Sequence, residues 1–76
     1  MKELKKEYTV RENHIFAESV DTDNPEKYIR DLMAELINDR SAHSLTDEQL
    51  EDLELAIFLD DELVFRMWSD GSWSQD

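Results

Sequence analysis

The sequence predicts a small α+β domain in which an N-terminal and a C-terminal hairpin form an antiparallel sheet packed against two helices. Three patterns support this class: β-branched and aromatic residues near the start, an apolar stripe spaced by three and four residues after Pro25, and alternation before the Asp70-Gly71 pair. The alternative is an all-α protein with a long C-terminal helix through Trp68, since that segment also contains good helix formers.

The first predicted element is a β-hairpin. Residues 8–10 and 14–20 are rich in β-branched and aromatic side chains, and the polar residues 11–13 separate them.

A helix is expected from Pro25 to about Arg40. Asx residues before Pro25 favour a capped start, because their side chains accept backbone N–H groups and proline at the first position needs no donor. The apolar stripe of this helix is Ile29, Leu32, Met33, Leu36 and Ile37.

A second helix is expected from Asp47 to about Leu59. Thr46 and Gln49 form a capping box in front of it. As a helix, the segment places Leu55 and Leu59 on its acidic side, away from the stripe of Leu50, Leu53 and Ile57. As a strand it would instead place Leu53, Leu55, Ile57 and Leu59 on one face, and this alternative stays open.

The C-terminal hairpin is predicted from the alternation of residues 63–68 and the Asp70-Gly71 turn signal. A two-residue turn with both residues at positive φ would set Ser69 opposite Ser72 and Trp68 opposite Trp73.

Length and charge limit the classes of protein. Seventy-six residues suffice for a single compact domain, expected to span residues 1–76. The formal net charge of −12 argues against direct binding to nucleic acid or to an anionic membrane surface, and it indicates a basic protein partner. The absence of cysteine and the short apolar run Leu55 to Leu59 lead us to expect a soluble, cytoplasmic protein.

The most unusual feature is the acidic stretch between Arg40 and Arg66, which contains no Lys or Arg. Like charges four residues apart destabilise a helix, so we expect a fold that tolerates them to use their electrostatic field in binding. The alternative interpretation, which stays open, is a solvated face that only keeps the protein soluble. The expected docking face consists of Glu51, Asp52, Glu54, Asp60, Asp61 and Glu62.

Trp68 and Trp73 are the second candidate site. A stabilising pair in the core or the hairpin is the more ordinary interpretation. Alternatively they anchor a protein interface, which Leu55 and Leu59 would extend or convert into a homodimer seam.

Catalysis is not expected, so the prediction is a protein that is not an enzyme. The two strong general-base candidates, His14 and His43, fall in different predicted elements, and no nucleophile elbow, phosphate loop or zinc helix is present. The acids around residues 21–25 and 60–62 lack the pattern of a calcium loop, so no metal or cofactor is expected.

These observations favour a stoichiometric inhibitor that docks its acidic face on the basic groove of a nucleic-acid-binding enzyme. In size and acidity the chain resembles phage-encoded anti-CRISPR and anti-restriction proteins and, more distantly, bacterial immunity proteins that neutralise nucleases. That resemblance implies a location in the host cell cytoplasm if the protein is phage-encoded. The alternative is a small adaptor or immunity-type module with an aromatic-anchored interface.

Overall fold

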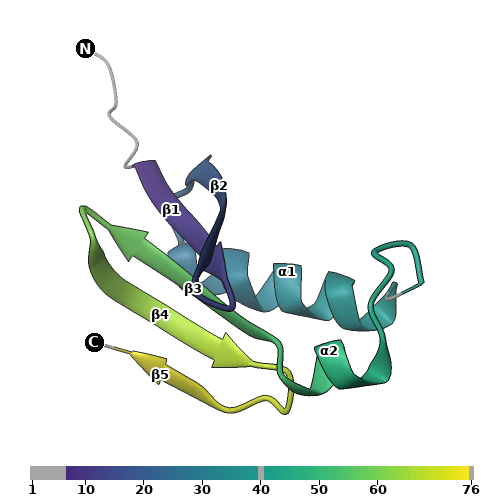
Figure 1. Cartoon of the computed structure of the whole chain (residues 1–76). Coiled ribbons are helices and arrows are strands. Elements are labelled where there is room, and N and C mark those ends of the chain that lie inside the picture. The colour runs from purple at the N-terminus through teal and green to yellow at the C-terminus, as the bar shows by residue number, and fades with distance from the viewer. Residues whose placement is uncertain (1–6, 40, 76) are drawn as a thin grey trace.

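The computed structural model describes residues 7–39 and 41–75, and it has the predicted α+β architecture (Figure 1). The strands are β1 (Glu7–Glu12), β2 (Ile15–Asp21), β3 (Glu54–Leu59), β4 (Glu62–Trp68) and β5 (Trp73–Gln75), and the helices are α1 (Pro25–Asn38) and α2 (Asp47–Glu51). Every neighbouring pair in the sheet, of order β2-β1-β3-β4-β5, is antiparallel. The all-α alternative is therefore not supported.

The N-terminal hairpin is confirmed, with a tighter turn than the polar segment suggested. Arg11 and Glu12 continue β1, and the turn consists of Asn13 (φ 52°) and His14 (φ 72°). Two consecutive residues at positive φ match the right-handed twist of the strands, and Asn tolerates that conformation well.

Helix α1 is confirmed, and it covers one face of the sheet by lying across β3 and β4 (Figure 1). Asn24 caps it by accepting the backbone N–H of Lys27 at 3.1 Å. Ile29, Met33 and Leu36 are buried against the strands, as the spacing predicts. Arg40, where the prediction ended this helix, lies outside the described residues.

The predicted extent of the second helix is wrong, because α2 ends at Glu51 and the chain continues as β3. The capping box at its start is present, with the Thr46 hydroxyl accepting the Gln49 N–H and the Gln49 side chain accepting the Thr46 N–H. A longer helix would place Leu55 away from its apolar stripe, whereas in the central strand Leu55 is only 1% exposed. Helix α2 contributes no buried residue, so α1 is the helix that packs broadly on the sheet.

The C-terminal hairpin forms, but its predicted register is wrong. Met67, not Trp68, pairs with Trp73, and the Trp68 N–H donates to the Ser72 carbonyl at 2.9 Å. Gly71 has φ +94° as predicted, whereas Asp70 is not at positive φ. The Asp70 carboxylate accepts the backbone N–H and the hydroxyl of Ser72, and this Asx turn favours a longer loop over the two-residue turn.

The shift in register places the two tryptophans on opposite faces of the sheet, because adjacent strand residues alternate. Trp73 lies on the face covered by α1, stacked on Phe65 with ring centroids 5.8 Å apart. Trp68 lies on the uncovered face, together with Ala56 of β3, and the Arg66 guanidinium is 6.0 Å from its ring. We call this uncovered side the open face; Thr9, Arg11, Glu54, Ala56, Phe58, Arg66 and Trp68 belong to it.

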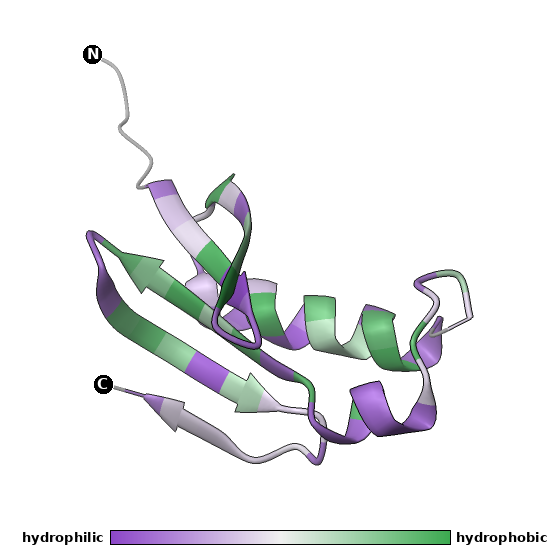
Figure 2. Cartoon of the chain, in the orientation of Figure 1, coloured by the Kyte–Doolittle hydropathy of each residue, from purple (hydrophilic) through white to green (hydrophobic). Residues whose placement is uncertain are grey.

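The apolar core lies between α1 and the sheet. Figure 2 shows hydrophobic residues along β3 and β4 and at intervals along α1. Val10, Ile29, Ile57 and Phe65 are fully buried in it. Neither described helix is long and apolar enough to cross a membrane.

Candidate functional site

Five of the six acids predicted as one docking face lie in two separate clusters, and Glu54 lies in neither. The α2 cluster consists of Glu51 and Asp52 together with Asp47 and Glu48, on α2 and at its C-terminal cap, and the turn cluster consists of Asp60, Asp61 and Glu62. All seven residues are exposed. The clusters lie at opposite ends of β3 (Figure 1), whose six residues span about 20 Å at roughly 3.3 Å per residue.

The turn cluster has a definite local cause. Asp60 (φ 52°) and Asp61 (φ 68°) form the two-residue turn between β3 and β4, and both are in the left-handed region. Aspartate is among the few residues other than glycine that occupy this region readily. The Asp-Asp pair is a weaker turn signal than Asp-Gly, which is why the sequence pattern drew attention to residues 70 and 71 instead.

Glu54 differs from the rest of the predicted docking face because it is only 9% exposed. It begins the central strand on the open face, where its carboxylate lies 3.3 Å from the Nε of Arg66 and 3.3 Å from the Nε2 of His14. Its backbone N–H donates to the Asn13 side chain at 2.8 Å. These contacts join the β1–β2 turn, β3 and β4, so the structure gives Glu54 a place in the fold and not on an exposed acidic surface.

The acids of α1 and those of the α2 cluster differ in whether they have partners in the described chain. Two acids of α1 form ion pairs, Glu26 with Arg30 at 2.9 Å and Asp31 with Lys27 at 2.6 Å, and the Glu35 carboxylate lies 3.4 Å from the Nε2 of His43. By contrast, the carboxylates of Glu48, Glu51 and Asp52 have no hydrogen bond or ion pair within residues 7–39 and 41–75. The charges of Glu48, Glu51 and Asp52 are therefore not neutralised by any described side chain.

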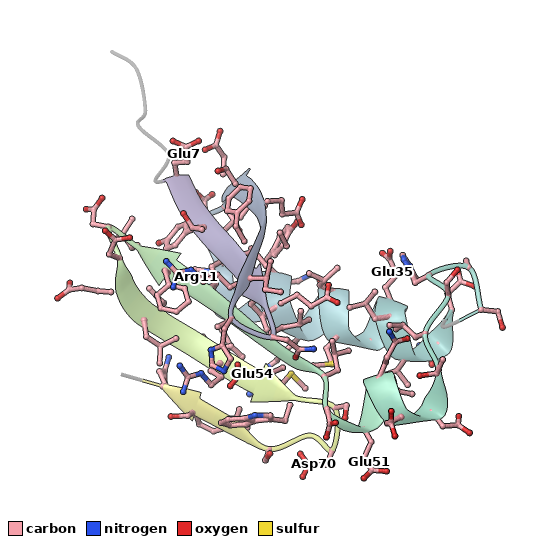
Figure 3. The ribbon with its side chains drawn as sticks, viewed as in Figure 1. Glu7, Arg11, Glu35, Glu51, Glu54 and Asp70 are labelled. Carbon is pink, nitrogen blue, oxygen red and sulfur yellow. The ribbon has the colours of Figure 1, made fainter. Side chains whose placement is uncertain are left out.

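A groove runs beside the α2 cluster, between α2 and the loop that joins β4 to β5. Its volume is about 520 Å³, and it is lined by Glu51, Trp68, Ser69, Asp70 and Ser72. Figure 3 shows Glu51 and Asp70 at the same end of the molecule, pointing outward. A second hollow of about 240 Å³ adjoins it, lined by Ile37, Asp47, Leu50, Glu51 and Ser69.

The position of Asp70 in this groove is fixed by Ser72. The Asp70 Oδ1 accepts the Ser72 backbone N–H at 2.9 Å and its hydroxyl at 2.6 Å. Both hydrogen bonds favour the ionised carboxylate and hold the pKa of Asp70 below its usual value. The groove therefore keeps a second, oriented negative charge next to Glu51 at neutral pH.

The open face carries basic and aromatic side chains that sequence reasoning did not assign to a site. The Arg11 guanidinium lies 4.5 Å from the centre of the Phe58 ring, and Phe16 on the neighbouring strand is 61% exposed. On the other face Trp73 is 51% exposed and lies 5.5 Å from the Arg30 guanidinium. Strand register, which brings residues 11, 16 and 58 together, was the signal that the sequence alone did not provide.

The described histidines do not meet in a cleft, since His14 lies beside Glu54 and His43 beside Glu35. Within residues 7–39 and 41–75, no three His, Cys, Asp or Glu side chains are arranged to hold a metal ion.

In comparisons with known proteins, the chain matches no protein-family model, no curated protein and no solved structure.

Proposed function

We propose that this protein is an inhibitor that binds a basic nucleic-acid-binding enzyme by imitating the charge of DNA or RNA. The observation that carries the proposal is the α2 cluster, whose carboxylates at Glu48, Glu51 and Asp52 are exposed and lack cationic partners in the described chain. Lys27 and Arg30 of α1 form ion pairs with Asp31 and Glu26 of the same helix instead. A surface of fixed, unneutralised carboxylates presents to a basic groove the same sign of charge as phosphates.

The separation of the two clusters suits an extended groove. About 20 Å along β3 corresponds to roughly six base pairs at about 3.4 Å each. A groove that holds a short duplex would reach both the α2 cluster and the turn cluster at once. The intended target would be a nuclease or nucleic-acid-guided complex, as in anti-CRISPR, anti-restriction or nuclease-immunity systems, and the site of action would be the cytoplasm that contains it.

The test is capture of partners from the native host with the immobilised protein, followed by mass spectrometry and competition. The proposal predicts that the captured protein is a basic nucleic-acid-binding enzyme and that duplex DNA or RNA releases it. It also predicts that the affinity for the partner falls steeply as the salt concentration rises, because the attraction between charges is screened beyond about 10 Å at 0.1 M ionic strength. A partner that binds the protein and nucleic acid simultaneously would contradict the proposal.

The aromatic residues of the open face support a second candidate, a small adaptor that binds through an aromatic-anchored interface. Phe16 is 61% exposed, and Arg11, Phe58 and Trp68 lie on the uncovered side of the sheet. Arginine and aromatic side chains commonly supply the binding energy of such interfaces. Binding of this kind would respond little to salt and would be lost in a Phe16→Ser variant, and these two results distinguish it from charge mimicry.

A further inference from the structure

We infer that the groove between α2 and the β4–β5 loop binds an arginine side chain of the partner. This inference rests on the proposed function, because it names the point at which a basic partner would be anchored. Three features of the groove carry it: its aromatic wall, its two carboxylates and the rigidity of the loop that holds them.

The aromatic wall is Trp68, which lines the groove from the end of β4. Its ring can accept a guanidinium, because cations are attracted to the face of an indole within about 6 Å. The guanidinium of Arg66 is 6.0 Å from the ring centre, at the outer limit of that range, and its Nε lies 3.3 Å from a Glu54 carboxylate oxygen. The groove itself contains no described Lys or Arg among its lining residues.

The two carboxylates belong to Glu51 and Asp70, which line the same groove from α2 and from the loop. The Glu51 carboxylate has no hydrogen-bond or ion-pair partner in the described chain, and Asp70 uses Oδ1 for Ser72. A planar guanidinium has donors on several edges, so it can stack on an indole and donate to both carboxylates. A lysine ammonium, a compact point charge, can satisfy fewer of these contacts at the same time.

The loop is held in shape before any ligand arrives. Gly71 N–H donates to the Trp68 carbonyl at 3.0 Å, Trp68 N–H to the Ser72 carbonyl at 2.9 Å, and Ser69 N–H to the Leu53 carbonyl at 3.2 Å. Binding would therefore require little ordering of the loop, which lowers its entropic cost.

The experiment is an NMR titration with the peptide acetyl-Ser-Arg-Ser-amide, with peptides containing lysine or citrulline in place of arginine as probes of the side chain. The Trp68 indole N–H signal, identified with a Trp73→Phe variant, reports on the groove. We expect the arginine peptide to shift this signal and the Glu51 and Asp70 amides, the lysine peptide to bind more weakly and the uncharged citrulline peptide not to bind.

The matched variants are E51Q/D70N in the groove and D60N/D61N in the turn cluster. Each variant removes two negative charges. Loss of two exposed ion pairs predicts about tenfold weaker binding for E51Q/D70N, and D60N/D61N should change affinity by less than about twofold. Asn suits the positive φ of residues 60 and 61 and retains the acceptor at residue 70, so both variants should fold. Equal losses in the two variants, equal binding of the lysine peptide or no shift at Trp68 would overturn the inference.

This result can be separated from the fate of the proposed function, because the titration uses no enzyme. If the groove binds the arginine peptide but the captured partner does not bind nucleic acid, the proposed function alone is refuted. If nucleic acid competes for the partner but the arginine peptide does not shift the Trp68 signal, this inference alone is refuted.

Discussion

Replacing Glu54 by Gln should destabilise the fold, although the same replacement at Glu51 should not. Both changes remove one negative charge, but Glu54 has a side chain only 11% exposed and 3.3 Å from Arg66, whereas Glu51 is exposed on α2. Loss of one partner from a fully buried ion pair costs about 3 to 5 kcal/mol. Because Arg66 remains 29% exposed and can be partly solvated, we expect about 1 to 3 kcal/mol here.

The assay is urea unfolding followed by circular dichroism, supported by thermal melting. A loss of about 1 to 3 kcal/mol in a domain of this size corresponds to a fall of roughly 4 to 24 °C in Tm. The variant E51Q should stay within about 0.5 kcal/mol of the parent. In a double-mutant cycle with Arg66→Met, the loss from E54Q should shrink, because the charge left unpaired is then absent. Equal stability of E54Q and E51Q would refute the reasoning.

Two further predictions concern the β4–β5 loop and Tyr28. Gly71→Val should cost about 1 kcal/mol or more in urea unfolding, solely through the backbone, because φ is +94° and a Cβ there would meet nothing within 4 Å; a neutral substitution would contradict the turn geometry. Burial and the hydrogen bond of the Tyr28 hydroxyl to Glu18 at 2.7 Å raise the pKa of Tyr28 from 10.0 to about 12. The folded state therefore keeps this proton to a higher pH than the unfolded state does, and the free energy of unfolding should fall as pH rises from about 10 to 12. Titration at 295 nm should show this pKa returning towards 10 in Glu18→Gln, and an unchanged value would show that Glu18 does not contribute.

Local signals predicted the elements whose local and tertiary preferences agree. The cap at Asn24 and the apolar stripe through Ile29 and Met33 predicted α1, and the β-branched segments predicted the first hairpin. Agreement between local preference and tertiary packing is what makes such segments readable.

The prediction failed where tertiary packing decides between two local options. Thr46 does begin a helix, but the apolar run that follows forms the central strand. No local pattern in the sequence shows that this run forms a strand and does not continue the helix. The same choice moved Glu54 from an expected exposed helix face into contact with Arg66. The pairing of Trp73 with Met67 likewise depends on an Asx turn at Asp70, which a dipeptide turn signal does not reveal.

The most direct test of the account is a titration of the captured partner with charge-reversal variants of the α2 cluster. E51K/D52K changes the net charge by the same amount as E7K/D21K, and all four residues are exposed. Glu7 and Asp21 are cross-strand partners on β1 and β2, away from α2. Their reversal replaces a pair of negative charges by a pair of positive charges, so the repulsion within the pair is retained.

If the α2 cluster docks in the partner's basic groove, E51K/D52K should lose about 2 to 5 kcal/mol of binding free energy for each desolvated contact, mainly through faster dissociation. E7K/D21K lies at the opposite end of the sheet, near the turn cluster, and should lose less affinity than E51K/D52K because it leaves the α2 cluster intact, with circular dichroism confirming that both variants fold. Equal losses from the two variants would show that only net charge matters, and full affinity in E51K/D52K would contradict the central claim.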